Sequence, residues 1–162
     1  MIRDFKNDIK TKGRPAELIF IQDFLLFFNI KYLDVSQQYK GYDFITDLFG
    51  KIDIKPYNDN GYISLETWSI FEKTIKGWID TSTANWFVFI SIKTRTMLFL
   101  RNDLKFKQWW LSNKDRFFER EQHSSNNGQI WTSKHRNVPI QELVASFYRK
   151  KDVQEKYQMP AF

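Results

Sequence analysis

The chain has 162 residues, carries 25 Lys and Arg against 19 Asp and Glu, and is 18% aromatic. That length suits one domain with a sizeable core, in which most of the aromatic rings should pack. The sequence contains no cysteine and only two histidines, which excludes disulfides, thiolate metal sites and His-rich zinc sites. A metal ion would therefore lie among carboxylates, which favour Mg²⁺ or Mn²⁺.

The first expected element is a strongly apolar helix over residues 15–28, with Pro15 at its first position. A helix this apolar should pack against a sheet on more than one side. Glu17 lies in its first turn, where a carboxylate interacts favourably with the helix dipole. Three short strands follow, over residues 42–48, 51–55 and 62–68.

The charged residues of these strands share a face. On the second strand the two isoleucines point one way, so Asp53 and Lys55 point the other way. Pairing the second and third strands on their apolar faces brings Glu66 onto the same side, and a slip of one residue would bury the charges. With Asp43 on the first strand, we expect three carboxylates and one ammonium on one side of one sheet.

The middle of the chain continues with a helix and two strands. The helix is expected over residues 70–80 and ends near Gly77. A nearly continuous apolar run over residues 86–92 is typical of a central strand, and residues 95–100 are its expected partner.

The predicted fold is α/β, of the α+β kind: a single domain over residues 1–162 with a central mixed sheet flanked by helices. Its α-β-β-β-α-β core lies within about residues 15–100, and residues 101–162 form a basic, mainly helical C-terminal part. In that part Asn102 or Asp103 can cap a helix. The other elements expected there are a polar loop over 123–128, a strand over 129–133, a helix over 140–148 and a loosely held tail.

Positive charge is concentrated towards the end of the chain. Residues 101–162 carry twelve Lys and Arg against seven Asp and Glu, which indicates a polyanionic partner. The candidate nucleic-acid-binding residues are Lys134, Arg136, Arg149, Lys150 and Lys151. The alternative for these basic clusters is an ordinary solvated surface.

Metal-assisted cleavage of a phosphodiester needs carboxylates that hold one or two divalent ions, and a nearby cation, usually Lys. The order helix, three strands, helix, strand, with acids on the strands, resembles the PD-(D/E)XK nuclease superfamily over roughly residues 15–92. Five blocks are similar, in order, to small phage and prophage proteins assigned to that superfamily: Gly41-Tyr42-Asp43, Asp53-Ile54-Lys55, Leu65-Glu66-Thr67, Gly77-Trp78 and Trp86-Phe87-Val88-Phe89-Ile90.

The resemblance can be mapped onto the chain in two ways. In the first, Asp43 is the motif Asp, and residues 53–55 are the acid-x-Lys. In the second, Asp53 is the motif Asp and Glu66 is the second acid. We favour the second mapping, because the helix should follow the third strand directly.

In the favoured mapping Trp68 stands where the lysine is expected, so Lys55 takes the lysine's role from the neighbouring strand. The resemblance then implies a role for each acid. The catalytic residues would be Asp53, Lys55 and Glu66, the ligands of Mg²⁺ or Mn²⁺ would be Asp53, Glu66 and Asp43, and Glu17 would be auxiliary.

The expected function is metal-dependent cleavage of DNA by an endonuclease or resolvase-like enzyme of phage or prophage type. The alternative is a non-catalytic member of the same fold that binds nucleic acid or a protein, and a weaker one is a structural protein whose polar strand face is solvated. The expected partner is nucleic acid, above all DNA, and a homodimer is the assembly considered. Since the sequence has no apolar run of about 20 residues and no signal peptide, we expect no membrane association and a location in the cytoplasm, that of the host cell for a phage protein.

Overall fold

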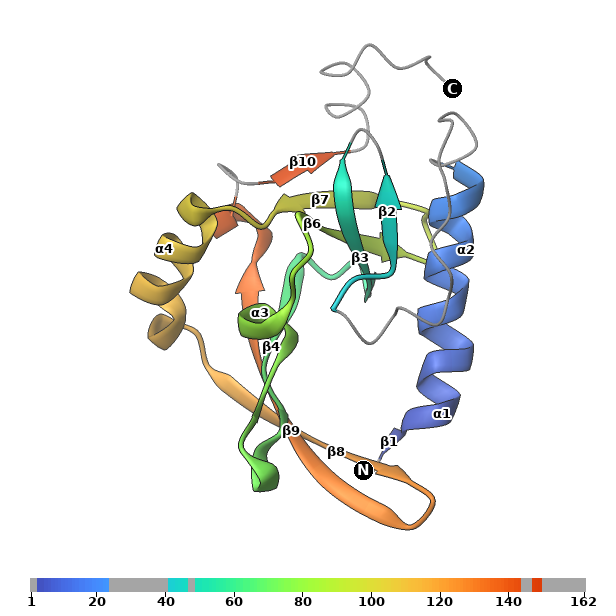
Figure 1. Cartoon of the computed structure of the whole chain (residues 1–162), viewed down its shortest axis with the longest axis vertical. Coiled ribbons are helices and arrows are strands. Elements are labelled where there is room, and N and C mark those ends of the chain that lie inside the picture. Colours follow the sequence, from blue (N-terminus) through green and yellow to red (C-terminus); the bar gives the residue numbers. More distant parts are fainter. Residues whose placement is uncertain (1–2, 24–40, 47–48, 144–146, 150–162) are drawn as a thin grey trace.

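The computed structural model describes residues 3–23, 41–46, 49–143 and 147–149 (Figure 1). Within these ranges the chain forms two five-stranded sheets and four α-helices. The predicted α+β class is confirmed. The predicted single central sheet is wrong, because the strands divide between two sheets that pack against a shared core.

The first sheet has the strand order β10-β7-β6-β3-β2. Its strands are β2 (Phe44–Thr46), β3 (Gly50–Tyr57), β6 (Trp86–Ser91), β7 (Met97–Arg101) and β10 (Phe147–Arg149). β3 and β6 are parallel, and the other pairs are antiparallel, so this sheet is mixed. A parallel pair requires a crossover connection, and here the chain from β3 to β6 passes through the second sheet.

The second sheet has the strand order β1-β8-β9-β4-β5. Its strands are β1 (Arg3–Asp4), β4 (Tyr62–Ile70), β5 (Ile75–Lys76), β8 (Glu119–Asn126) and β9 (Gln129–Pro139). β8 and β9 form a long hairpin, drawn in orange at the bottom of Figure 1. At its turn Asn127 and Gly128 have φ values of 51° and 79°, the geometry that Asn-Gly favours in tight hairpins.

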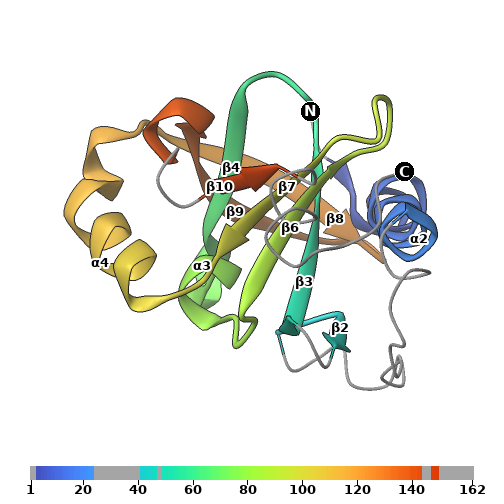
Figure 2. The ribbon, with the colours of Figure 1, turned by 90° about the horizontal axis from the view of Figure 1, so that it is seen from above.

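The helices lie at the two sides of the molecule and between the sheets. They are α1 (Phe5–Asp8), α2 (Arg14–Asp23), α3 (Trp78–Thr81) and α4 (Leu104–Asn113). A π-helical segment, Ile9–Gly13, joins α1 to α2, and short 3₁₀ turns lie at Phe71–Lys73, Lys114–Arg116 and Ile140–Leu143. α2 and α4 stand on opposite sides of the sheets (Figures 1 and 2). Among the helices in the described residues, none has the length and apolar character that crossing a membrane requires.

β3 is buried on both of its faces. Ile52 and Ile54 belong to a buried cluster with Phe20 of α2. The opposite face of the first sheet, including Phe89 of β6, shares a second cluster with Leu65 of β4. Because both faces of β3 are largely covered, a buried charged side chain there, such as that of Asp53, must find its partners within the protein.

Two predictions about the middle of the chain are wrong. The strands expected at 51–55 and 62–68 do not pair in the described residues: β3 pairs with β2 and β6, whereas β4 pairs with β9 and β5. The reason is that their apolar faces belong to different clusters: Ile52 and Ile54 of β3 pack with α2, whereas Ile63 and Leu65 of β4 pack in the second cluster.

The helix expected over residues 70–80 is replaced by a short turn, β5 and the brief helix α3. Gly77 precedes this helix instead of ending one, and its amide donates to the Thr67 carbonyl of β4 at 2.9 Å. A Cβ atom at Gly77 would lie 2.0 Å from the Glu66 carbonyl oxygen. The segment is therefore held against β4 by backbone contact, which a surface helix could not make.

The prediction that residues 101–162 are mainly helical is wrong for the part that the structure describes. α4 is present and begins as predicted, since Asp103 Oδ1 accepts from the Phe106 amide at 2.9 Å. Most of the remainder is the β8–β9 hairpin, which takes in the expected loop over 123–128 and extends the expected strand beyond residue 133. In place of the helix over 140–148 there are a single turn and β10.

The helix expected over residues 15–28 is confirmed as far as Asp23, and the expected strands over 42–48, 86–92 and 95–100 correspond to β2, β6 and β7. Residues 24–28 of the first helix and the expected tail after residue 150 lie outside the described residues.

Candidate active site

Asp53 and Lys55 form an ion pair on β3, with 2.9 Å between Lys55 Nζ and Asp53 Oδ1. Asp53 is 5% exposed, and both side chains project from the face opposite Ile52 and Ile54, as the sequence predicted. Removing a charged group from water costs on the order of several kcal/mol for each ion. The attraction within a buried pair does little more than offset this cost, so the pair adds little to stability. Such a pair is therefore a candidate for function.

Asp43 joins this pair from the residue before β2. Its amide donates to the Ile52 carbonyl at 2.8 Å, and its Oδ2 accepts from the Ile54 amide at 2.6 Å, so both ends of the residue are fixed to β3. Burial, and next the charge of Asp53, raise the pKa of Asp43 to about 7. We refer to Asp43, Asp53 and Lys55 as the charged cluster.

Lys55 supplies the positive charge of the cluster. Burial alone would lower the pKa of Lys55, but the charges of Asp53, Asp43 and Glu66 together raise it above its ordinary value. The ammonium also lies 4.9 Å from the centre of the Trp78 ring, within reach of a cation–π contact. Lys55 is therefore a protonated cation at neutral pH.

Glu66 faces the ammonium from the second sheet and not from a hairpin partner of β3. Its Oε2 accepts from Ser69 Oγ at 2.6 Å and from the Trp78 amide at 3.3 Å. Its charge contributes to the raised pKa of Lys55. The predicted association of Glu66 with Lys55 is thus present as an electrostatic one, although the strand pairing from which it was predicted is absent.

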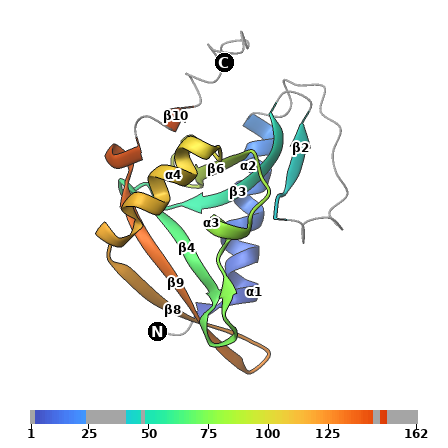
Figure 3. The same ribbon diagram turned by 60° about the vertical axis from the view of Figure 1, so that its left-hand side comes forward.

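The contact between α3 and β4 explains how Glu66 is oriented (Figure 3). The pairing of β4 with β9 shifts register between Glu66 and Trp68. At that point Gly77 lies against β4, which directs the next amide, that of Trp78, towards the Glu66 carboxylate. The ring of Trp78 meanwhile packs on Phe87 of the first sheet, with 4.7 Å between centroids.

Ser82 and Gly41 support the cluster, and the sequence analysis assigned neither of them to the site. Ser82 is 8% exposed, and its Oγ donates to the Gly41 carbonyl at 2.5 Å and lies 3.5 Å from Asp53 Oδ2. Gly41 has a φ of 80°, which favours glycine, and its Cα faces the Ser82 backbone. No periodic pattern in the sequence marks a serine that joins two segments so far apart.

Glu17 of α2 accepts from Arg14 Nη1 at 2.8 Å. It lies near enough to Asp43 for its charge to make the smallest contribution to the raised pKa of that residue. The helix acid predicted from the sequence therefore lies towards the charged cluster, with its own charge partly balanced by Arg14.

The predicted metal ligands can be tested against the chemistry of the site. Among the described residues, no three His, Asp or Glu side chains gather closely enough to hold a metal ion. Asp43, Asp53 and Glu66 are thus not a preformed group of three. Asp43 and Asp53 remain as two neighbouring buried carboxylates, the type of ligand that hard divalent cations prefer.

The basic residues predicted to contact nucleic acid are engaged with carboxylates. Lys134 lies 3.6 Å from Glu119 and 3.5 Å from Glu121. Arg136 lies 2.9 Å from Asp115 and 3.5 Å from Glu119. These ion pairs oppose the predicted role in binding phosphates, because the neighbouring carboxylates already neutralise both side chains.

Three further basic residues of the prediction have no described side chains. Arg149 is described only as part of the backbone of β10, and Lys150 and Lys151 lie outside the described residues. Trp68, at the position where the favoured mapping expected a lysine, lies beneath the ammonium of Lys76, which is 3.6 Å from its ring centre.

Comparison of the chain with protein-family models gives no match. Comparison with curated proteins and with solved structures likewise gives no significant match. The chemistry of this site is accordingly argued from its own geometry.

Proposed function

We propose that this protein is a metal-dependent phosphodiesterase that cleaves DNA, with Asp43 and Asp53 as cation ligands and Lys55 as the assisting cation. The observation that carries the proposal is the charged cluster itself: Asp53 and Lys55 are paired on β3, and the carboxylate of Asp43 is bonded to the same strand from the residue before β2. Because such a cluster returns little stability for its desolvation, a chemical role is the better explanation of its presence.

Each residue of the cluster is held for a distinct task. The Ile54 amide fixes one oxygen of Asp43, which leaves the other oxygen for a ligand. When bound, Mg²⁺ or Mn²⁺ would activate water and neutralise the charge that develops on the phosphate. Lys55 stays protonated beside the cluster, so its ammonium can donate to a phosphate oxygen as negative charge accumulates there.

This geometry supports the first of the two mappings onto the PD-(D/E)XK pattern. Asp53 and Lys55 share one strand and one ion pair, which suits an acid-x-Lys at residues 53–55. Asp43, on the neighbouring segment, then takes the place of the preceding motif Asp. Glu66 becomes a positioning residue, since it acts on Lys55 and Trp78 and is not one of three gathered ligands.

The direct test is incubation of the protein with supercoiled plasmid, linear duplex and branched DNA, in Mg²⁺ or Mn²⁺. We expect cleavage by the wild type, and a loss of about a hundredfold or more in Asp53→Asn, since that variant removes a cation ligand. Asp80→Asn is the matched control, because Asp80 is an exposed carboxylate of α3. Cleavage unchanged in Asp53→Asn, or absent with every substrate, would refute the proposal.

A non-catalytic module that binds nucleic acid or a protein is the second candidate function. The observation that favours it is that no three acidic side chains gather in the described residues. Calorimetry with Mn²⁺ separates the two candidates. Binding heat that disappears in Asp43→Asn supports the enzyme, whereas DNA binding that needs no metal, with no Mn²⁺ heat, supports the module.

A further inference from the structure

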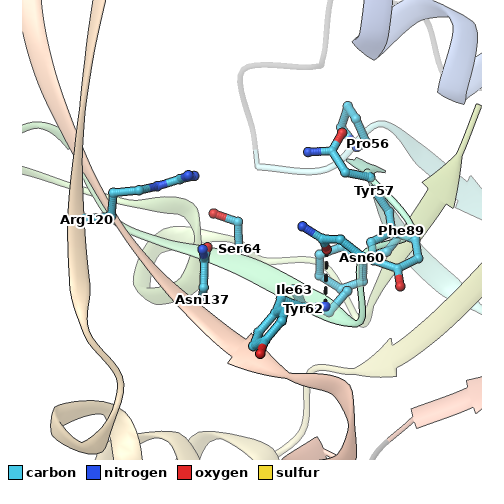
Figure 4. Close-up of a pocket in the computed structure, with 10 residues that line it drawn as sticks. Pro56, Tyr57, Asn60, Tyr62, Ile63, Ser64, Phe89, Arg120 and Asn137 are labelled. Atoms are coloured by element: carbon cyan, nitrogen blue, oxygen red, sulfur yellow. Dashed lines mark hydrogen bonds between the residues drawn. The ribbon is translucent and has the colours of Figure 1, made fainter.

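A polar hollow opens beside the charged cluster, at the end of β3 (Figure 4). Asp53, Lys55 and Tyr57 alternate along one face of β3, and Tyr57 lines the hollow. Phe89 also lines it, and this residue is the register partner of Lys55 on β6. The hollow therefore lies next to Lys55, on the same face of β3.

The wall opposite β3 comes from the second sheet. Ser64 of β4, Arg120 of β8 and Asn137 of β9 direct their side chains towards the hollow in Figure 4. Within the part of the chain that the structure describes, these three side chains make no hydrogen bond or ion pair with the protein. Polar groups that converge on one space and remain unpaired there are available to a ligand.

The chemistry of the lining selects an anion that carries a flat, hydrogen-bonding ring. The residues that line the hollow include Arg120 and three asparagines but no Asp or Glu. Tyr62, which is 49% exposed, offers a ring at the rim for stacking. The cavity is small, with a volume of about 80 Å³, so a ligand can insert only one group into it and a base pair cannot enter.

We propose that the hollow binds one unpaired nucleotide of the substrate strand, next to the phosphate at which cleavage occurs. The base stacks on Tyr62, its edge meets the amide of Asn137 and the hydroxyl of Ser64, and Arg120 binds a flanking phosphate. The inference rests on the proposed function, and it adds that the substrate carries at least one unpaired nucleotide beside the cleavage position.

The proposal is tested by binding in EDTA, where cleavage cannot occur. Fluorescence anisotropy compares a labelled single-stranded oligonucleotide with the matching duplex, for the wild type, Tyr62→Ala, Tyr62→Phe and Arg120→Ala. Base stacking on an aromatic ring predicts that Tyr62→Ala weakens single-strand binding about five- to a hundredfold, whereas Tyr62→Phe retains it. Arg120→Ala should reduce the slope of log affinity against log salt by about one.

Matched controls separate the hollow from the general surface. Phe118 is 85% exposed and lies outside the hollow, so Phe118→Ala controls for the loss of an exposed ring. Lys107, exposed on α4, provides the charge control as Lys107→Ala. Equal effects in the controls, or unchanged single-strand binding in Tyr62→Ala, would overturn the proposal.

Two further outcomes are informative. Competition by free dTMP at the concentration of the oligonucleotide would identify a free nucleotide as the ligand, and so overturn the assignment to the substrate strand. If Tyr62→Ala loses single-strand affinity but the wild type cuts no DNA in Mg²⁺ or Mn²⁺, the nucleotide site stands and the proposed function fails. If the wild type cuts DNA but Tyr62→Ala leaves single-strand binding unchanged, the proposed function stands and the nucleotide site fails.

Discussion

Replacement of Asp43 by Asn should make the protein more stable while it removes activity. In the folded state burial, and then the charge of Asp53, raise the pKa of Asp43 from 3.8 to about 7. The folded state thus holds this proton more tightly than the unfolded state does. The stability associated with the proton is fully present below pH 3.8 and is lost as the pH rises to about 7.

The size of the effect follows from the same values. At about 1.4 kcal/mol for each pKa unit, the interval from 3.8 to about 7 corresponds to roughly 4 kcal/mol above neutral pH. Part of this cost comes from burial, which a neutral amide also experiences in part. We therefore expect Asp43→Asn to gain about 2 kcal/mol near pH 8. The Asn side-chain oxygen can still accept from the Ile54 amide.

The assay is urea unfolding followed by tryptophan fluorescence, at pH values from about 4 to 8. The stability of Asp43→Asn relative to the wild type should increase across that range and level off above about pH 7. Asp80→Asn, at an exposed carboxylate, should show no such trend. A variant that is destabilised at every pH, or a difference that does not change with pH, would refute the reasoning about the charged cluster.

Three further substitutions test other parts of the structure by the same unfolding assay. Lys55→Met leaves Asp53 without its cation. We expect the free energy of unfolding to fall by roughly 2–4 kcal/mol near pH 8 and cleavage to be lost, whereas Lys107→Met should show no comparable change. Gly77→Ala places a Cβ against the backbone of β4 and should cost about 3 kcal/mol; Gly13→Ala, where a Cβ meets no atom within 4 Å, should change stability by less than about 1 kcal/mol. Asp103→Ala removes the cap of α4 and should cost about 1 kcal/mol, and a neutral result would show that the Phe106 amide is satisfied otherwise.

The sequence was sufficient to assign faces but not partners. The two isoleucines of β3 fixed the direction of Asp53 and Lys55 correctly, because a strand alternates its side chains whatever lies beside it. The same alternation in β4 was read as a hairpin with β3. Alternation does not say whether two apolar faces line the same side of one sheet, and here they lie in two separate clusters, that of β3 against α2 and that of β4 against the other face of the first sheet.

The C-terminal hairpin shows a different limit. β8 consists almost wholly of polar residues, so it has no hydrophobic period from which a strand could be predicted. The signal that was available is local: Asn127-Gly128 is a strong indication of a tight hairpin turn. The segment around Gly77 had no such signal, since its apolar residues recur every four positions as a helix would require.

The position of the charged cluster explains why a substrate subsite should lie where the hollow does. β3 carries apolar side chains on one face, and on the other it carries Asp53 and Lys55, followed by Tyr57 at the hollow. The first sheet supplies the acids, and the second sheet faces them with Glu66 and, further along, with Arg120. Cation ligands, an ammonium and the polar hollow therefore follow one another along this face of β3. The pH dependence of stability tests the acids, and single-strand binding tests the hollow, so the two ends of this face can be examined independently.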